Sequence, residues 1–252
     1  MMMGKFIKIG CLFFLLISIN PETWGWGGAR GEGSDITEFE WATWPDYCKA
    51  AFLNSEWGHG SPFTDRISMS SMSEYRKTYM QKIGVPGPHH FCLATIYIKR
   101  ARGGIGVTQK KSIELLKRAI DEITYSYGRM SKSAPLFSTV SAYYGIALYQ
   151  SGDHDRAFEI WKEGITVQPN KPESYVAMAE ALRSERKMKE ALELLLRFDK
   201  VKQQPSAEVE YFLGHTYLDL GLYDDAKRHA DKAYQLGYPL PGLKNKLRRI
   251  GK

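Results

Sequence analysis

Residues 138–239 divide into three consecutive segments: STVSAYYGIALYQSGDHDRAFEIWKEGITVQPNK (138–171), PESYVAMAEALRSERKMKEALELLLRFDKVKQQPS (172–206) and AEVEYFLGHTYLDLGLYDDAKRHADKAYQLGYP (207–239). Two sets of small residues recur at spacings of 34 and then 35 residues: Gly145, Ala179 and Gly214, and Ala157, Ala191 and Ala226. Because two independent markers keep one period, the sequence predicts an internal repeat.

Each segment also shows the spacing of two amphipathic helices. Apolar residues recur at helical intervals, which places them on one stripe: Tyr144, Leu148 and Trp161; Met178, Leu182 and Leu195; Leu213, Tyr217 and Ala233. The turn between the helices falls at Gly152, Arg186 and Gly221, and the segments end near Pro169, Pro205 and Pro239. We therefore predict three antiparallel helix pairs, in which the small residue of the first helix allows the second to approach closely.

This pattern resembles the tetratricopeptide repeat, which has a small residue at its eighth position, alanine at its twentieth and proline near its thirty-second. The resemblance covers about 100 of the 252 residues, and the second segment departs from it at Arg186 and Phe198, where glycine and alanine are usual. It implies an all-α fold, a right-handed superhelix of antiparallel helix pairs. It also implies a non-enzymatic scaffold that binds a protein or peptide.

The resemblance further implies a partner-binding groove lined by the first helix of each pair. Projection of the repeat positions onto the inner face selects Thr139, Ala142, Ile146, Tyr149, Glu173, Val176, Glu180, Arg183, Glu208, Tyr211, His215 and Asp219. Relatives that clamp a C-terminal carboxylate use lysine, asparagine and arginine at such places. The positions here are mostly not basic, so we do not expect that clamp. The alternative that several of these side chains are simply solvated stays open.

The first 29 residues have the features of a secretory signal peptide. Lys5 and Lys8 form a positive region, residues 9–19 are mostly apolar, and Gly27-Gly28-Ala29 offers small residues for cleavage. Eleven residues are too few to span a bilayer, although retention as an anchor remains an alternative. We expect an exported protein, in the periplasm of a Gram-negative bacterium or at the cell surface, with no transmembrane helix in the mature chain.

Composition fits a folded, mildly basic exported protein. Hydrophobic residues make up 43% of the chain, and the net charge is +7. Removal of residues 1–29 takes away two lysines and one glutamate, which leaves 33 − 27 = +6. Cleavage also leaves two cysteines, Cys48 and Cys92, and an even count in an oxidising compartment predicts a disulfide.

Residues 30–137 are predicted to form a helical N-terminal extension. One helix begins at Trp44-Pro45-Asp46, a second covers about 68–83, and a third covers 89–102. Thr108 is predicted to cap a fourth helix, which would complete a degenerate repeat-like hairpin with the third. Its predicted buried stripe is Ile113, Leu116, Ala119, Ile120 and Ile123. The motifs WPDYC (44–48) and HHFC (89–92) also resemble a segment that precedes such repeats in some exported bacterial proteins.

Enzymatic readings find little support in the sequence. The histidines His59, His89 and His90 with the two cysteines could be imagined as a zinc or copper site, but paired metal-ligand spacings are missing and a disulfide is favoured. The glycine-rich RGGIG (102–106) lacks the lysine and hydroxyl of a nucleotide-binding loop. We therefore predict no catalytic residues, no metal, no cofactor and no nucleic-acid partner.

Residues 240–252 form a basic tail, predicted to be a capping helix. Leu243, Leu247 and Ile250 would cover the end of the repeat array, while five basic residues face water. The alternative function is that this helix binds an anionic polymer or a membrane surface, with the steep salt dependence of charge-driven binding. By analogy, the setting of the scaffold would be the assembly of a pilus, secretion or polysaccharide-export complex.

Overall fold

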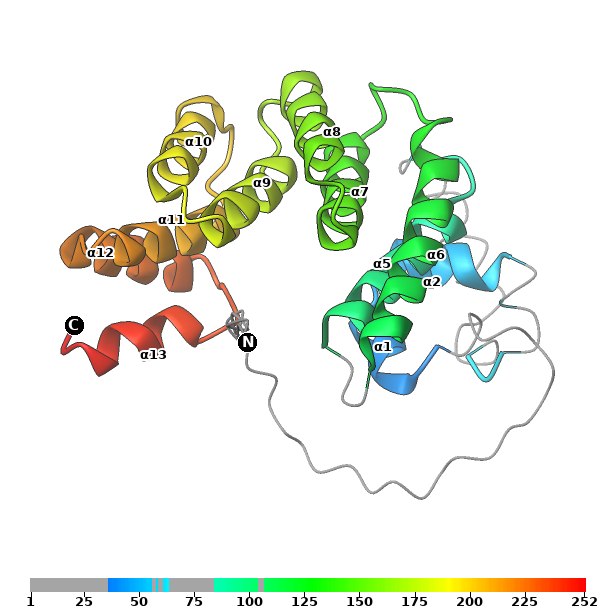
Figure 1. Cartoon of the computed structure of the whole chain (residues 1–252), viewed down its shortest axis with the longest axis horizontal. Coiled ribbons are helices and arrows are strands. Elements are labelled where there is room, and N and C mark those ends of the chain that lie inside the picture. Colours follow the sequence, from blue (N-terminus) through cyan, green and yellow to red (C-terminus); the bar gives the residue numbers. More distant parts are fainter. Residues whose placement is uncertain (1–35, 56–57, 59–60, 64–83, 104–106) are drawn as a thin grey trace, which may run out of the picture.

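The computed structural model describes residues 36–55, 58, 61–63, 84–103 and 107–252 (Figure 1). Eleven helices and no strand occur in these ranges, which confirms the all-α expectation. The predicted signal segment and the predicted helix over 68–83 lie outside the described residues. Within the described ranges, no helix is both long enough and apolar enough to cross a membrane.

The helices form an N-terminal group followed by three pairs and a last short helix. The N-terminal group is α1 (Glu38–Thr43), α2 (Asp46–Leu53), α5 (Pro88–Gly103) and α6 (Gln109–Tyr127). The pairs are α7 (Phe137–Ser151) with α8 (His154–Val167), α9 (Glu173–Ser184) with α10 (Met188–Val201), and α11 (Ala207–Asp219) with α12 (Tyr223–Gln235), followed by α13 (Gly242–Arg249). Figure 1 shows them as a curved row from α5 and α6 at one end to α12 and α13 at the other.

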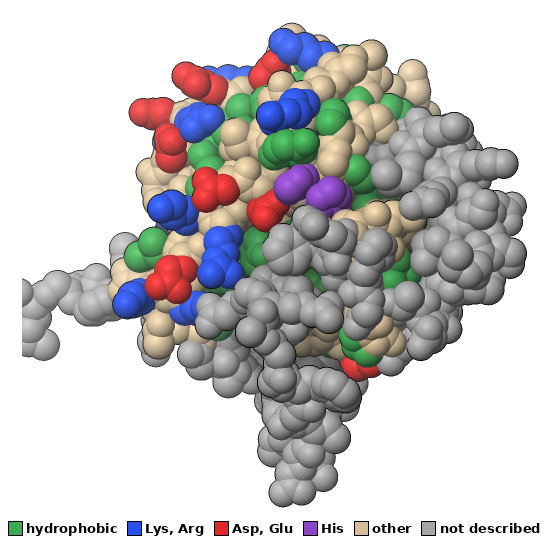
Figure 2. Space-filling view, turned by 90° about the vertical axis from the view of Figure 1, so that its right-hand side faces the viewer, with side chains coloured by type: hydrophobic (Ala, Val, Ile, Leu, Met, Phe, Trp, Pro, Cys, Tyr) green, Lys and Arg blue, Asp and Glu red, His purple; other side chains and the backbone are tan. Residues whose placement is uncertain are grey.

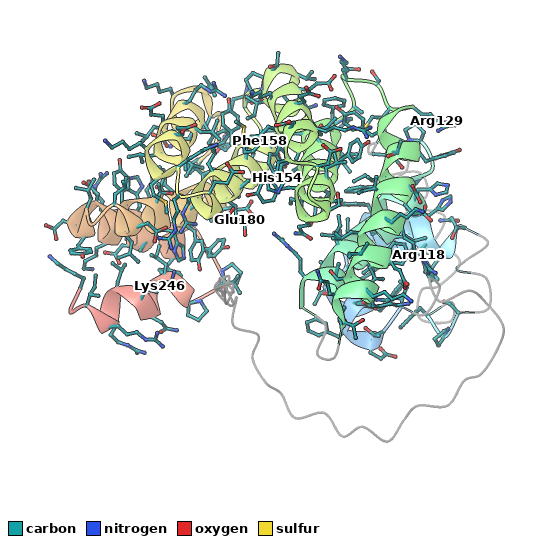
Figure 3. The ribbon with its side chains drawn as sticks, viewed as in Figure 1. Arg118, Arg129, His154, Phe158, Glu180 and Lys246 are labelled. Atoms are coloured by element: carbon teal, nitrogen blue, oxygen red, sulfur yellow. A yellow bond between two sulfur atoms is a disulfide. The ribbon has the colours of Figure 1, made fainter. Side chains whose placement is uncertain are left out.

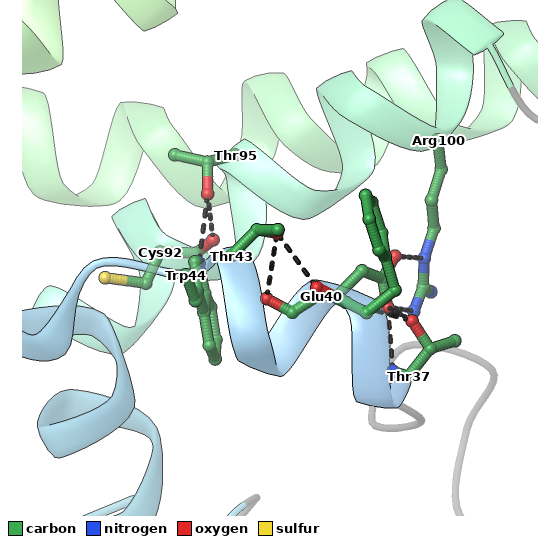
Figure 4. Close-up of polar contacts among 8 residues, drawn as sticks. Thr37, Glu40, Thr43, Trp44, Cys92, Thr95 and Arg100 are labelled. Carbon is green, nitrogen blue, oxygen red and sulfur yellow. Dashed lines mark hydrogen bonds and ion pairs between the residues drawn. The ribbon is translucent and has the colours of Figure 1, made fainter. Parts of the chain in front are cut away.

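Helix α1 is fixed to α5 by a partly buried ion pair. The Glu40 carboxylate accepts from Nε of Arg100 at 2.7 Å and from its Nη2 at 2.8 Å, and it also accepts from the backbone of Thr37 in a capping box (Figure 4). Burial alone would raise the pKa of Glu40, but the hydrogen bonds from Arg100 and Thr37 outweigh it and lower that pKa. Nearby, the ring of Trp41 stacks on Phe63 with centroids 4.5 Å apart.

The predicted pairing of the cysteines is confirmed. Cys48 of α2 and Cys92 of α5 form a disulfide across a sequence separation of 44 residues, and both side chains are buried. Ala51 and Phe52 of α2 are also buried. The disulfide therefore joins α2 to α5 inside the core of the N-terminal group.

The predicted cap and most of the predicted stripe of α6 are confirmed, with one error. The side chain of Thr108 accepts from the backbone N–H of Lys111, and Leu116, Ala119 and Ile123 are buried. The prediction that Ile113 is buried is wrong, because its side chain is 60% exposed. It lies at the edge of the arc centred on Leu116, Ala119 and Ile123, and Leu115 is buried on the other side of that arc.

Small residues allow close helix packing in the first and third pairs, as the sequence predicts. A Cβ atom at Gly145 of α7 would lie 2.2 Å from the indole nitrogen of Trp161 in α8, which instead donates to the carbonyl of Ala142 at 3.1 Å. A Cβ at Gly214 of α11 would meet Leu243 at 2.5 Å and the α12 backbone at 3.2 Å. Side chains larger than hydrogen at these two positions would push the neighbours apart.

The three turns inside the pairs share one backbone conformation. Gly152 and Gly221 have positive φ angles of 97° and 77°, and Arg186 has a φ of 64° at the equivalent position. Each turn also has the same backbone hydrogen bond. The N–H of the residue that follows the positive-φ residue donates to the carbonyl of the residue five positions earlier in the chain, at 2.9–3.0 Å. Arg186 therefore adopts a left-handed conformation that costs a residue with a Cβ about 1–2 kcal/mol.

We predict that Arg186→Gly raises the free energy of unfolding by about 0.5–1 kcal/mol, because the relieved strain exceeds the entropy that glycine adds to the unfolded chain. Urea titration followed by circular dichroism measures the change. The matched control is Gly152→Ala, which should lower stability by about 1 kcal/mol, since a Cβ at Gly152 would meet no atom within 4 Å and only the backbone conformation is tested. A destabilised Arg186→Gly would contradict this account.

The last helix, α13, packs on the third pair through two of the three residues predicted to do so. Leu243 and Leu247 are buried against α11 and α12. The prediction that Ile250 helps to cover the end of the array is wrong, because its side chain is 46% exposed at the end of the helix. Lys252 folds back to donate to Asp224 at 2.6 Å, while Lys244 and Arg249 are exposed. Binding of an anionic polymer by this helix stays a prediction.

Candidate functional site: the concave face

The first helices of the pairs form a continuous inner layer. α7 packs against α9, and α9 packs against α11, whereas the second helices α8, α10 and α12 pack mainly against the first helix of their own pair and of the next. A row whose first helices touch and whose second helices diverge must curve toward the first helices. The concave face is therefore built from α7, α9 and α11 (Figure 1).

Polar contacts tie each inner helix to the next through equivalent repeat positions. The hydroxyl of Tyr149 lies 2.8 Å from that of Ser184, at the junction of the first and second pairs. At the next junction the equivalent residues are Arg183 and Asp219, and the Arg183 guanidinium donates to Asp219 at 3.1 Å from Nε and 2.5 Å from Nη2. The hydroxyl of Tyr149 also donates to the Glu185 carboxylate at 3.2 Å. Equivalent positions therefore use hydrogen bonds of a tyrosine at the first junction and an ion pair at the second.

The twelve residues projected onto the inner face fall into three groups. Ala142, Val176, Tyr211 and His215 are buried. Tyr149, Arg183 and Asp219 take part in the junction contacts, and Thr139 donates to Glu173 at 3.4 Å. Ile146, Glu173 and Glu180 are partly exposed, and Glu208 is exposed. Glu180 lies on the concave side of α9 (Figure 3).

Two of the tyrosines contribute to packing as well as to the face. Tyr149 stacks on His154 with ring centroids 4.2 Å apart, and Tyr211 stacks on Tyr238 at 4.0 Å. The ring of Tyr211 also contacts that of His215 at 4.6 Å. Alanine substitutions at Tyr149 and Tyr211 would therefore disturb the helix junctions as well as any binding surface.

Several residues at this face were missed in the sequence. Tyr47 of α2 lies near Tyr143 and Glu173, and burial together with these two neighbours raises the pKa of Tyr47 to about 12. Arg102 of α5 reaches Glu180 across the face at 3.7 Å. Tyr143 had a usable signal, since it lies four residues after Thr139 and on the same helical stripe. Tyr47 and Arg102 had none, because they come from outside the repeats.

His215 is held neutral in the wall of the face. Its side chain is 7% exposed, and burial, with the charges of Arg183 and Lys246 nearby, lowers its pKa to about 3. Its Nδ1 atom is buried without a hydrogen-bond partner in the described part of the chain. A neutral imidazole in this place adds no positive charge to the concave face.

The histidine and cysteine group considered for metal binding is divided in the structure. Both cysteines are in the disulfide. His89 and His90 lie side by side with ring centroids 4.3 Å apart, and Nδ1 of His90 is 2.5 Å from Glu122. Figure 2 shows two adjacent histidine side chains on the molecular surface. His59 lies outside the described residues, and among those described no three His, Cys, Asp or Glu side chains converge as a metal site would require.

A separate depression lies along α12, away from these residues. It is lined by Asp224, Lys227, Arg228, Asp231, Lys232 and Gln235. Several of these side chains pair along the helix, including Lys227 with Asp231 at 2.9 Å and Arg228 with Asp225 at 2.6 Å. This is the pattern of a solvated helix face.

The sequence matches no protein-family model and no curated protein. Any function assigned to the concave face must therefore come from its own residues.

Proposed function

We propose that the chain is an exported scaffold of the tetratricopeptide-repeat type, and that it binds an extended segment of a protein or peptide against its concave face. The observation that carries the proposal is the row of three helix pairs with equivalent turns, whose first helices make one continuous inner layer. Such a row presents an extended surface of the kind on which repeat proteins bind their partners. The right-handed superhelical path is part of this proposal.

The residues of the concave face suit recognition of a segment better than a reaction. Partly exposed Ile146 offers apolar contact, and Glu173, Glu180 and Glu208 offer acceptors, along three successive helices. Spacing of these groups over three repeats favours an elongated ligand that runs along the row. We propose the scaffold role as non-enzymatic on this basis.

The disulfide supports an oxidising compartment. Buried cysteine pairs of this kind persist in the periplasm and outside the cell, which agrees with the signal-like first 29 residues. We place the protein in the envelope of a Gram-negative bacterium, in the periplasm or at the cell surface. An envelope assembly such as a pilus, secretion or polysaccharide-export complex is the proposed setting.

Site-specific photo-crosslinking tests the proposed surface. A photo-reactive phenylalanine analogue is placed at Ile146 or Glu180 on the concave face, and at the exposed Glu159 or Glu193 of the outer helices α8 and α10 as controls. We expect the inner positions to give the same discrete adducts in envelope preparations, and the outer positions to give none of them. These four sites avoid the junction residues, so each variant should fold.

Adducts that form equally from both faces, or only from the outer helices, would contradict the proposal. Circular dichroism of each variant confirms that loss of an adduct is not loss of structure. Identification of the adduct by mass spectrometry then names the partner.

A further inference from the structure

The concave face has two carboxylates, Glu173 and Glu208, at equivalent positions of α9 and α11. At the preceding junction, between α7 and α9, the equivalent residues form a hydrogen bond. Thr139, Glu173 and Glu208 occupy one repeat position in α7, α9 and α11, separated by 34 and 35 residues. Thr139 donates to Glu173 at the first junction. At the second junction the equivalent residue is Glu208, a second carboxylate, which is repelled by the charge of Glu173.

A third carboxylate strengthens this negative field. Glu180 lies two helical turns beyond Glu173 on α9. The side chain of Glu208 keeps contact with solvent, but the protein atoms packed around it remove part of its hydration. This partial desolvation, together with repulsion from Glu173 and Glu180, raises the pKa of Glu208 to about 7. The other titratable groups near Glu208 are Tyr143 of α7 and Tyr238 after α12, and burial and Glu208 raise the pKa values of both.

Basic residues offset this field in part. The Arg102 guanidinium lies 3.7 Å from Glu180, with both side chains substantially exposed, and Arg183 is bound to Asp219. In a chain with a net charge of +7, the concave face is therefore a local region of the opposite sign.

A second observation points to a missing donor. Oε1 of Glu173 accepts from Thr139, but Oε2 is buried and has no hydrogen-bond partner within the described residues. Buried acceptors are almost always satisfied, and leaving one unmade is costly. The Glu173 side chain as a whole is only partly covered.

Tyrosine rings border the same carboxylates. Tyr47 lies near Glu173, and Tyr143 and Tyr238 lie near Glu208. Tyr238 also stacks on Tyr211. Aromatic faces attract ammonium and guanidinium groups, and carboxylates bind the same groups through charge-assisted hydrogen bonds. An anionic segment would instead meet three carboxylates.

We propose that the occupant of the concave face is an extended peptide segment rich in lysine or arginine, whose cationic side chains pair with Glu173, Glu180 and Glu208. This inference rests on the proposed function and names the chemistry of its partner. Charge complementarity between the acidic face and the cationic segment sets specificity and the rate of association.

Selection of random linear peptides displayed on phage tests the inference on the full chain. The test variant carries Glu173→Gln, Glu180→Gln and Glu208→Gln, and the matched control carries Glu159→Gln, Glu190→Gln and Glu193→Gln on the exposed sides of α8 and α10. Both variants replace three carboxylates by amides. We expect lysine and arginine to be enriched in the selected peptides. The strongest-binding peptide is then synthesised. Its affinity should fall roughly tenfold or more for the test variant and stay unchanged for the control variant.

The outcomes separate the two proposals. If no selected peptide depends on the inner residues, both the groove and its cationic partner are rejected. If the peptides depend on the inner residues but are neutral or acidic, the groove stands and the cationic partner is overturned.

The pH dependence of the affinity for the selected peptide, synthesised without histidine, gives an independent measurement. A cationic peptide binds the ionised form of Glu208, so its affinity should rise between about pH 6 and about pH 8 as this carboxyl loses its proton. Glu208→Gln should flatten this rise. An equal rise in Glu208→Gln would remove Glu208 from the proposed site.

Discussion

Replacement of Cys48 and Cys92 together by alanine is expected to destabilise the N-terminal helices by about 4 kcal/mol, because the disulfide closes a long loop and restricts the unfolded chain. The separation of 44 residues sets this magnitude. Alanine fits the two buried positions with little lost volume, so loss of the cross-link dominates. Reduction of the wild type should have the same effect.

Hydrogen exchange locates the effect along the chain. Amides of α2 and α5 should lose protection, and those of α10 to α12 should keep it, because repeat arrays are stabilised mainly by neighbouring units. The first pair should respond in part, since α7 and α8 share one apolar core with the N-terminal helices. Unchanged protection in α5, or uniform loss through α12, would contradict this prediction.

Glu210→Ala is expected to lower the free energy of unfolding by about 2–3 kcal/mol, because it removes a buried carboxylate that binds side chains of other helices and leaves the buried His229 without its partner. The Glu210 side chain is 2% exposed, and its carboxylate lies 2.7 Å from Nδ1 of His229 and also contacts Lys232. Lys202 lies 3.9 Å away. The network joins α10, α11 and α12.

The pH dependence of this effect has a definite sign. Burial opposes ionisation of Glu210, but hydrogen bonds from His229 and Lys232 outweigh it and lower its pKa below the ordinary 4.5. The stabilisation is therefore complete above about pH 4.5 and is lost as the pH falls through the lowered value. Urea unfolding at neutral pH and at about pH 3 should show a large difference between wild type and Glu210→Ala that shrinks in acid.

The exposed Glu193→Gln of α10 is the control for Glu210→Ala, and it should change stability by less than about 0.5 kcal/mol at either pH. Equal effects of the two substitutions would show that the network adds no stability. Glu210→Gln separates charge from shape, since it keeps the volume and removes only the ionised oxygen.

The helix pairs could be predicted because their determinants are local and repeated. The period of Gly145 and Gly214 marks close helix contacts, and the turn positions mark the reversals between helices. Arg186 departs from the glycine pattern, yet its turn has the same hydrogen bond as the other two. Tertiary packing of α9 and α10 therefore holds a conformation that the local sequence disfavours.

The chemistry of the concave face could be predicted only in part. Spacing places Tyr149 on the inner helix, but side-chain length brings its hydroxyl to Ser184 at the junction. Tyr47 and Arg102 come from helices whose position depends on long-range packing around the disulfide. Likewise, periodicity includes Ile113 and Ile250 among the apolar positions without showing that their side chains are exposed.

The junction contacts also give the row a fixed order. At equivalent positions the first junction pairs Tyr149 with Ser184, and the second pairs Arg183 with Asp219. A helix pair docked out of sequence would leave the guanidinium or the carboxylate without its counter-charge, which penalises the wrong arrangement. The side chains at the two junctions thereby distinguish three helix pairs whose turns are equivalent.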